Sequence, residues 1–279
     1  MISAKTIQIF LPDGNPRSVK IAEITSRTIQ AVLIPRSNLD YALSREELRS
    51  VGVYFLIGNS DENVKETVYV GEAEDCVQRL KQHNASKDFW RYALVVLSKT
   101  KYFTKTHIKF LEWYSYTLIA KANRYELENG NFPSKPFVSE PVEADLIDNF
   151  DTIRILCSTL GFPFFEEIVK PHNKDILVCK GKDGYAEGQY TEDGLIVFAK
   201  SKCNLAETRT VQEWIKSTRK KLLKDKILIQ EGDVLVFSSD YIFNSPSAAS
   251  ATVLGRSSNG WNDWKTKDGK TLHELKRAK

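Results

Sequence analysis

Residues 51–57 read VGVYFLI and residues 67–70 read TVYV, and these two runs decide the fold of the first half of the chain. Both are rich in β-branched and aromatic residues, which favour strands. The polar stretch GNSDENVKE separates them. We therefore predict an antiparallel hairpin with a long, solvated turn.

The segment after the hairpin predicts alternating helix and strand. Residues 71–83 read GEAEDCVQRLKQH, where Val77 and Leu80 repeat at helical spacing behind three acidic residues that favour a helix start. Residues 92–97 (YALVVL) indicate a buried third strand, and residues 106–122 carry the apolar stripe of a helix that packs on a sheet. The expected fold class is α+β, a three-stranded antiparallel sheet flanked by helices.

The second half of the chain differs in character. The proline-rich stretch from Gly130 to Val142 is typical of a linker, and a helix is expected at 143–160 with Gly161 as its stop. From residue 177 onward, short β-like pieces surround a basic amphipathic segment at 210–226. We expect a separate C-terminal α+β domain.

Composition places the chain among globular proteins. It has 279 residues, 42% hydrophobic and 27% charged, and its net charge of +4 permits an acidic partner such as nucleic acid without requiring one. No apolar run near the start is long enough for a signal peptide or a membrane span, so a cytoplasmic location is expected. The four cysteines form no C-x-x-C pair and the four histidines do not cluster near them, which argues against a disulfide framework or a zinc site.

A sequence motif runs through the predicted hairpin and helices. It consists, in chain order, of Gly52-Val53-Tyr54, Tyr69-Val70-Gly71, Arg79, His83 and Glu112. The segment resembles the GIY-YIG nuclease family, which includes homing endonucleases, certain restriction enzymes and the N-terminal cutting domain of the bacterial excision-repair nuclease. The resemblance covers about a third of the chain.

The resemblance implies a phosphodiester hydrolase. Such a reaction needs an activated water, charge stabilisation on the phosphate, and an acid or metal at the leaving oxygen. By similarity, Glu112 would be the single protein ligand for Mg²⁺ or Mn²⁺, and Arg79 would bind the phosphate. The products expected from the family are a 3′-hydroxyl and a 5′-phosphate. Arg79 and His83 are four residues apart, so they share a helical face.

Other site positions are less sharply assigned. Tyr54 and Tyr69 lie on paired strands, where their hydroxyls can converge. Tyr69 is the family-like general base, although a free tyrosine titrates near 10, and His83 is the rival base or orients the water. Asn129 matches the late asparagine of the family, with Asn131 as the alternative. Two features depart from the family: the hairpin turn is longer, and Glu72 stands where several members carry a lysine.

The C-terminal half carries a second patterned stretch. Ser245-Pro246 and Gly255 bound a short, slim helix, and an Asn259-Gly260 turn precedes two tryptophans. The stretch resembles a C-terminal domain of unknown function, the 4357 type, often joined to restriction and nuclease domains, and is similar to the RAMA module. This implies DNA binding, including modified bases. The nucleic-acid-binding candidates are Arg219, Lys220, Lys221, Arg256, Trp261, Trp264 and Lys265. The alternative is that the tryptophans close a small core and the lysines are only solvated.

The sequence therefore predicts a metal-dependent DNA endonuclease with a C-terminal DNA-recognition domain. The expected divisions are an N-terminal extension (1–48), the GIY-YIG nuclease domain (49–135), a linker and helix (136–176) and the C-terminal domain (177–279). Two alternatives stay open: a non-catalytic nucleic-acid-binding protein with the same fold, and an RNA-directed nuclease. A single site cuts one strand at a time, so a homodimer would be one route to double-strand cutting.

Overall fold

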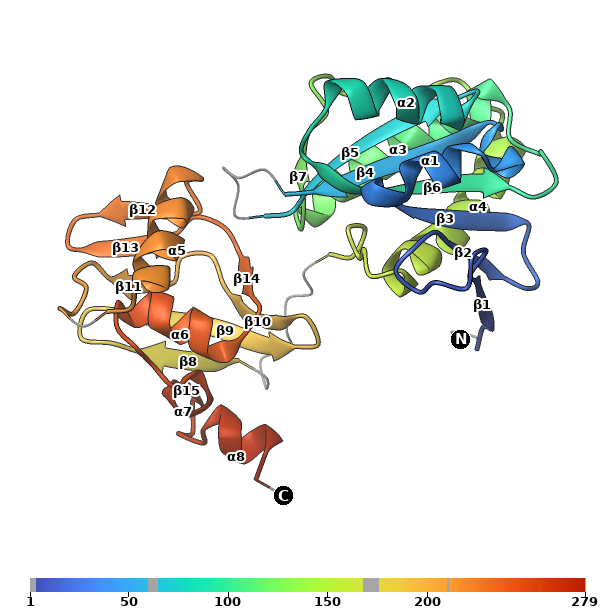
Figure 1. The fold of residues 1–279 in the computed structure, drawn as a ribbon. Helices are drawn as coiled ribbons and strands as arrows, with labels where there is room; N and C mark the ends of the chain where they lie inside the picture. The colour runs from blue at the N-terminus through green and yellow to red at the C-terminus, as the bar shows by residue number, and fades with distance from the viewer. Residues whose placement is uncertain (1–3, 60–64, 168–175, 210, 279) are drawn as a thin grey trace. The chain divides into compact units, whose positions relative to one another are not determined.

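A computed structural model describes residues 4–59, 65–167, 176–209 and 211–278 (Figure 1). The chain divides into two compact units, Met1–Ile168 and Val169–Lys279. Most of the predicted hairpin turn, residues 60–64, lies outside the described residues, as do residues 168–175 of the predicted linker segment.

The first unit is built on one mixed sheet. Within its described residues the sheet has seven strands in the order β1-β2-β3-β6-β4-β5-β7. Neighbouring strands are antiparallel except β5 and β7, which are parallel. The strands are β1 (Ile7–Phe10), β2 (Lys20–Ile24), β3 (Ile29–Pro35), β4 (Gly52–Gly58), β5 (Thr67–Ala73), β6 (Trp90–Ser98) and β7 (Glu126–Leu127).

The predicted three-stranded antiparallel sheet is the centre of this larger sheet. The hairpin β4–β5 and the third strand β6 form as expected, with β4 paired to both of the others. Residues 1–48, expected as an extension, supply β1, β2 and β3 to the same sheet, because β3 pairs with β6 along its whole length from Ile29↔Ser98 to Pro35↔Tyr92. The sheet is thus wider than the motif alone indicates.

Helices cover both faces of this sheet. On one face, α3 (Lys105–Ala122) and α4 (Glu140–Thr159) pack over inward residues of β4 such as Phe55. On the other face, α1 (Leu39–Leu43) and α2 (Cys76–Ser86) pack over alternate residues such as Tyr54. Two 3₁₀ turns, Arg36–Asn38 and Glu46–Leu48, flank α1. The alternation along β4 is the two-residue period of a strand buried on both faces.

The second unit is a separate α+β domain, as predicted. Its described residues form an eight-stranded sheet in which β12-β13-β11-β9-β10-β14 follow one another and β8 bridges β9 and β15. Helix α6 (Pro246–Leu254) packs against several of these strands. The remaining elements are β8 (Leu177–Lys180), β9 (Tyr185–Thr191), β10 (Gly194–Val197), β11 (Lys202–Asn204), α5 (Glu213–Lys224), β12 (Leu228–Glu231), β13 (Val234–Phe237), β14 (Tyr241–Phe243), α7 (Gly260–Asp263), β15 (Trp264–Thr266) and α8 (Leu272–Lys276).

Candidate active site

The two motif tyrosines meet on one face of the β4–β5 hairpin. Tyr54 pairs with Gly71 and Tyr69 with Leu56, so the two side chains are diagonal neighbours, and their ring centroids are 6.2 Å apart. Gly71 makes this close approach of the Tyr54 ring to β5 possible. A Cβ at Gly71 would lie 2.2 Å from Tyr54 Oη, so only glycine leaves room for the phenol to lie across the partner strand.

Helix α2 brings two further motif residues to Tyr54. The Asp75 side chain caps the helix by accepting from Gln78 N at 3.1 Å, and Val77 and Leu80 bury its inner face. Arg79 Nε donates to Tyr54 Oη at 3.1 Å, and Tyr54 Oη lies 2.7 Å from His83 Nε2. The helical spacing of Arg79 and His83 thus places both at one hydroxyl group.

The direction of these hydrogen bonds follows from protonation. Burial, foremost, raises the pKa of Tyr54, so its hydroxyl stays protonated. Burial and then the charges of Arg79 and Lys87 lower the pKa of His83 to about 4, so the imidazole is neutral near pH 7. In the tautomer that carries its proton on Nδ1, His83 Nε2 accepts from Tyr54 Oη, which itself accepts from Arg79 Nε. In this arrangement Tyr54 orients Arg79 and cannot serve as a base.

A pH-dependent stability follows from His83. Its pKa in the folded protein, about 4, lies below the roughly 6.5 of an unfolded chain, so between these values the unfolded state binds a proton that the folded state does not. Stability from this group is complete above about pH 6.5 and is lost as pH falls toward 4. The unfolding free energy of the wild type should fall between pH 7 and pH 5. In the His83→Gln variant we expect this fall to be smaller by about 1 kcal/mol.

Urea unfolding at both pH values measures this difference. Gln is suitable because its amide oxygen can still accept from Tyr54. Every other titrating group is present in both proteins, so its contribution cancels in the comparison. Equal pH dependence of wild type and variant would contradict a neutral, buried His83.

Tyr69 has a different environment from Tyr54. Its side chain is partly exposed, and Lys87 Nζ lies 4.7 Å from the centre of its ring. The Tyr69 and His83 ring centroids are 5.1 Å apart. Lys87 was not among the predicted site residues; it directly follows α2 and is four residues after His83.

Glu112 lies on α3 with its carboxyl group only partly exposed. Burial, and next the charge of Glu72, raise the pKa of this carboxyl to about 7, while Lys109 and Arg79 act in the opposite direction. The backbone of Glu72 also gives a hydrogen bond that stabilises the ionised form. Glu112 thus belongs to the same electrostatic neighbourhood as Arg79.

The donor set around Glu112 fits a hard divalent cation. Two carboxylates, those of Glu112 and Glu72, influence each other, and a cation would relieve their repulsion. Among the described residues, no three His, Cys, Asp or Glu side chains form a group that could enclose a metal. Water and phosphate oxygens would therefore complete the coordination shell, as Mg²⁺ usually requires.

Asn129 joins the segment after β7 to the neighbouring strand β5 by two hydrogen bonds. Its Oδ1 accepts from Val70 N at 3.0 Å and its Nδ2 donates to Val70 O at 2.7 Å. Val70 lies between Tyr69 and Gly71, so the amide continues the β5–β7 ladder beside the motif. Asn131, the alternative candidate, is exposed and makes no comparable contact within the described residues. Asn129 is a positioning residue.

Comparison with known families fits this geometry. Residues 50–130 match the family model described as the GIY-YIG catalytic domain. This segment is a GIY-YIG domain. Residues 177–276 match a second family model, a domain of unknown function designated DUF4357. No curated protein and no solved structure gave a significant match. The match supports a nuclease-type family for residues 50–130, and the order of the two domains is the predicted one.

Two of the predicted nucleic-acid contacts in the DUF4357 domain are wrong. Arg219 is 2% exposed, and its guanidinium donates to the carbonyl of Asn204 instead of facing solvent. Trp264 is fully buried, and its Nε1 donates to Pro246 O at 3.1 Å. Neither side chain can reach a nucleic acid in this structure.

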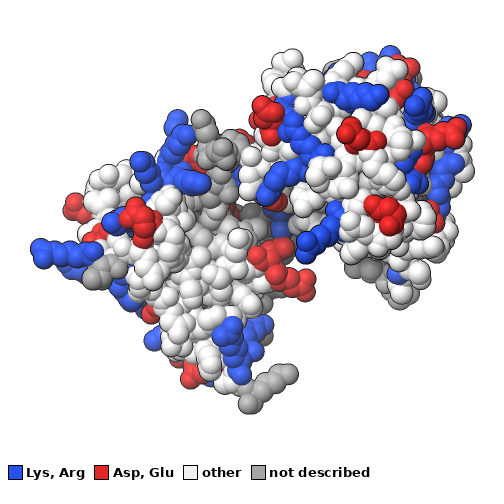
Figure 2. All heavy atoms as spheres, viewed as in Figure 1, with Lys and Arg blue, Asp and Glu red and all other residues white. Residues whose placement is uncertain are grey.

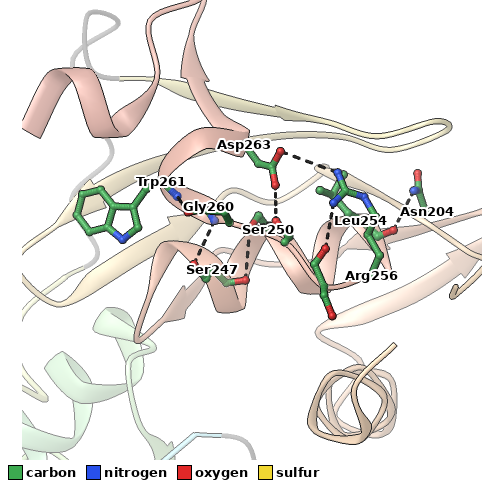
Figure 3. Close-up of polar contacts among 11 residues, drawn as sticks. Asn204, Ser247, Ser250, Leu254, Arg256, Gly260, Trp261 and Asp263 are labelled. Carbon is green, nitrogen blue, oxygen red and sulfur yellow. Dashed lines mark hydrogen bonds and ion pairs between the residues drawn. The ribbon is translucent and has the colours of Figure 1, made fainter. Parts of the chain in front are cut away.

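The remaining aromatic candidate, Trp261, is already stacked. The Arg277 guanidinium lies 3.5 Å from the centre of its ring, and Tyr190 meets it edge-on. Figure 3 shows Trp261 following Gly260, whose amide donates to Ser247 Oγ at 3.1 Å. A Cβ on Gly260 would lie 2.0 Å from the Pro246 carbonyl carbon, so glycine is required where α7 meets α6.

Arg256 is half exposed but is held within the domain. Figure 3 shows its guanidinium directed at Asp263, at 3.9 Å, and its Nη1 donates to Ser257 O. Ser258 Oγ donates to the other oxygen of Asp263 at 2.6 Å. Lys265 and the helix residues Lys220 and Lys221 are exposed, as predicted.

Within the described residues, no helix is both long and apolar enough to cross a membrane.

Proposed function

We propose that this chain is a metal-dependent endonuclease that hydrolyses DNA phosphodiester bonds with its GIY-YIG domain. One observation carries the proposal: Arg79, Tyr54 and His83 form a hydrogen-bonded set beside Tyr69. The same Arg79 acts electrostatically on Glu112, whose carboxyl has a pKa raised to about 7. Perturbed groups that converge in this way are typical of a catalytic site.

Arg79 is assigned to the phosphate. Tyr54 accepts from its Nε, and Gln82 Oε1 accepts from its Nη1 at 3.0 Å, which fixes the guanidinium plane. A guanidinium has five N–H donors, so donors remain for a phosphate oxygen, where a planar fork stabilises the charge that develops during attack.

Tyr69 is assigned as the general base. Tyr54 is excluded by its raised pKa, and His83 Nε2 already accepts from Tyr54. Tyr69 is partly exposed and lies near the positive charge of Lys87. In the proposed step, Tyr69 acts as the phenolate and takes a proton from water while the water oxygen bonds to phosphorus. The bond from phosphorus to the 3′ oxygen breaks, and that oxygen takes a proton from solvent water. The products are a 3′-hydroxyl and a 5′-phosphate.

Glu112, with Glu72 beside it, would hold the Mg²⁺ or Mn²⁺ ion. When bound, such an ion stabilises negative charge on phosphate oxygens and on the leaving group. The contribution of the protein is the ionised carboxylate of Glu112, which the fold keeps in a partly desolvated position close to Arg79.

The DUF4357 domain is proposed to add DNA contacts through α5. Lys220 and Lys221 are exposed there and form no ion pair with any residue that the structure describes, and Trp214 is 45% exposed on the same helix. Figure 2 shows Lys and Arg side chains gathered over the part of this unit where α5 lies in Figure 1. Trp214 was not predicted, although it precedes Lys221 by two helical turns.

We expect Lys220→Gln with Lys221→Gln to weaken DNA binding in a salt-dependent way. Each lost phosphate contact lowers the slope of log K against log salt by roughly 0.9. Fluorescence anisotropy with a labelled duplex over a KCl series measures this slope. Lys180→Gln with Lys182→Gln is the matched control, because it removes the same charge from another surface of the same domain. Equal slopes for both double variants would exclude α5 as a phosphate contact.

A nicking assay tests the function itself. Supercoiled plasmid DNA is incubated with the full chain and Mg²⁺ or Mn²⁺, with EDTA as the control, and structured RNA is tested in parallel. We expect metal-dependent conversion of plasmid to the nicked form. Cleavage of RNA alone would redirect the proposal to an RNA nuclease. Absence of any cleavage across both substrates and both metals would leave a nucleic-acid-binding protein.

A further inference from the structure

A small polar pocket lies at the open end of the β4–β5 hairpin, where β4 begins and β5 ends. It has a volume of about 180 Å³, and its lining includes Arg49, Ser50, Glu74, Ser98 and Lys101. None of these residues belongs to the GIY-YIG motif. Its wall is also formed by Val51, the residue before β4, and this links the pocket directly to the strand that carries Tyr54.

The charge of this pocket is positive. Within the described part of the chain, neither Arg49 nor Lys101 forms an ion pair, and both are exposed. The acidic residue of the lining, Glu74, is paired with Lys105, which neutralises it. Two unneutralised cations with serine hydroxyls between them are suited to an anion with several oxygen acceptors.

The backbone positions both cations. Lys101 has φ of 54°, a left-handed conformation that is unfavourable for lysine, and its amide donates to Ser98 O at 3.1 Å. Ser98 Oγ in turn lies 3.1 Å from Thr100 Oγ1. Arg49 follows the 3₁₀ turn Glu46–Leu48, and its amide donates to Glu46 O at 3.0 Å. Both side chains therefore start from fixed points of the backbone in the pocket lining.

A line of residues on α3 connects the pocket with Glu112. Lys105, Lys109 and Glu112 are spaced by four and three residues, so they follow one face of this helix. Lys105 reaches Glu74 in the pocket wall, and Lys109 acts electrostatically on Glu112. Lys105 and Glu112 are seven residues apart, which corresponds to about 10 Å along the helix axis.

We propose that this pocket binds a backbone phosphate of the DNA that the active site cuts, at a nucleotide flanking the scissile phosphate on the same strand. Lys105 and Lys109 then lie along the path between the two phosphates. The inference rests on the proposed endonuclease function and identifies a substrate contact outside the motif. A phosphate held there fixes the register of the strand without reading its sequence.

The test is DNA binding by the full chain in a Glu112→Gln background, which keeps the substrate intact. Arg49→Gln with Lys101→Gln is compared with Lys5→Gln with Arg17→Gln, which removes the same charge from exposed positions near β1. Affinity for a labelled duplex is measured by anisotropy over a KCl series. We expect the pocket variant to bind about tenfold more weakly and its salt slope to fall by roughly 1, while the control stays within about twofold of the parent.

A charge-conserving variant, Arg49→Lys with Lys101→Arg, separates loss of charge from loss of folding. It should bind DNA within about threefold of the parent, because a phosphate accepts either cation. Equal weakening by the pocket and control variants, or equal weakening by the charge-conserving and Gln variants, would overturn the proposal.

Failure of the endonuclease proposal and failure of the pocket proposal give different results in these experiments. If wild type cuts plasmid but the pocket variant binds normally, the pocket inference fails alone. If wild type cuts nothing while the pocket variant still loses affinity and salt slope, the endonuclease proposal fails and the pocket remains a DNA contact.

Discussion

Glu112→Gln is expected to lower the single-turnover rate of plasmid nicking by at least about a thousandfold, with little change in DNA affinity. The amide is almost the same size as the carboxylate, but it is neutral and a much weaker ligand for a hard cation. Electrostatic stabilisation of the developing charge is usually the largest contribution to catalysis, so its loss should appear in the rate and not in binding.

The same substitution should make the protein more stable at pH 8. The pKa of Glu112 in the folded protein, about 7, lies above the value near 4.5 of an unperturbed glutamate, so the folded state favours the protonated form. Stability from this group is present below about pH 4.5 and is lost as pH rises through 7. Gln keeps the neutral form at every pH. Because the carboxyl is partly exposed, solvent screening reduces the gain to on the order of 1 kcal/mol.

Plasmid nicking and urea unfolding at pH 8 provide the two measurements. Glu128→Gln is the matched control, since Glu128 is an exposed residue beside β7 and should alter neither rate nor stability. A variant at Glu112 that keeps more than about a tenth of the rate would remove it from the catalytic set. A variant that loses both rate and stability would indicate a structural role instead.

The fold of the motif could be predicted because its signals are local. The β-branched runs of β4 and β5 flank one polar turn, and the helical spacing of Val77 and Leu80 defines the inner face of α2. Once these elements form, the register Tyr54↔Gly71 and the four-residue spacing of Arg79 and His83 bring the site together. Each step depends on residues close in sequence.

The width of the sheet could not be predicted from local pattern. Strands β1, β2 and β3 have ordinary β-rich sequences. Their place in this sheet comes from the pairing of β3 with β6, whose paired residues are 57 to 69 positions apart in the sequence. A two-residue period indicates a strand and says nothing about its partner. The partner is selected by burial on both faces, which only the assembled core determines.

The errors in the DUF4357 domain have a related cause. Arg219 lies in a run of basic residues that resembles a solvated helix face, yet the loop carbonyls of Asn204 and Leu205 accept from its guanidinium in the interior. Trp264 has an aromatic ring that could stack on a base and an indole N–H that could contact it, but this N–H donates to Pro246 O. In both cases the acceptors are backbone oxygens, whose positions no side-chain pattern reveals.

Arg79→Lys should lower the nicking rate by about a hundredfold or more although it conserves the charge. Arg79 donates from Nε to Tyr54 and from Nη1 to Gln82, and these two contacts fix the plane from which the remaining nitrogen can reach a phosphate. The single ammonium group of lysine cannot keep both contacts and also reach the substrate. Loss of one oriented donor at a developing oxyanion typically costs about 10²–10³ in rate.

Two neighbouring variants make this expectation specific. Lys81→Gln removes an exposed charge from the same helix and should leave the rate within about twofold, which excludes a general effect of α2 charge. Gln82→Ala removes a contact that only orients Arg79, so the rate should fall by less than about tenfold with unchanged DNA affinity. If Arg79→Lys instead weakens DNA binding as much as it slows nicking, the guanidinium serves ground-state binding, and its assignment to the transition state is wrong.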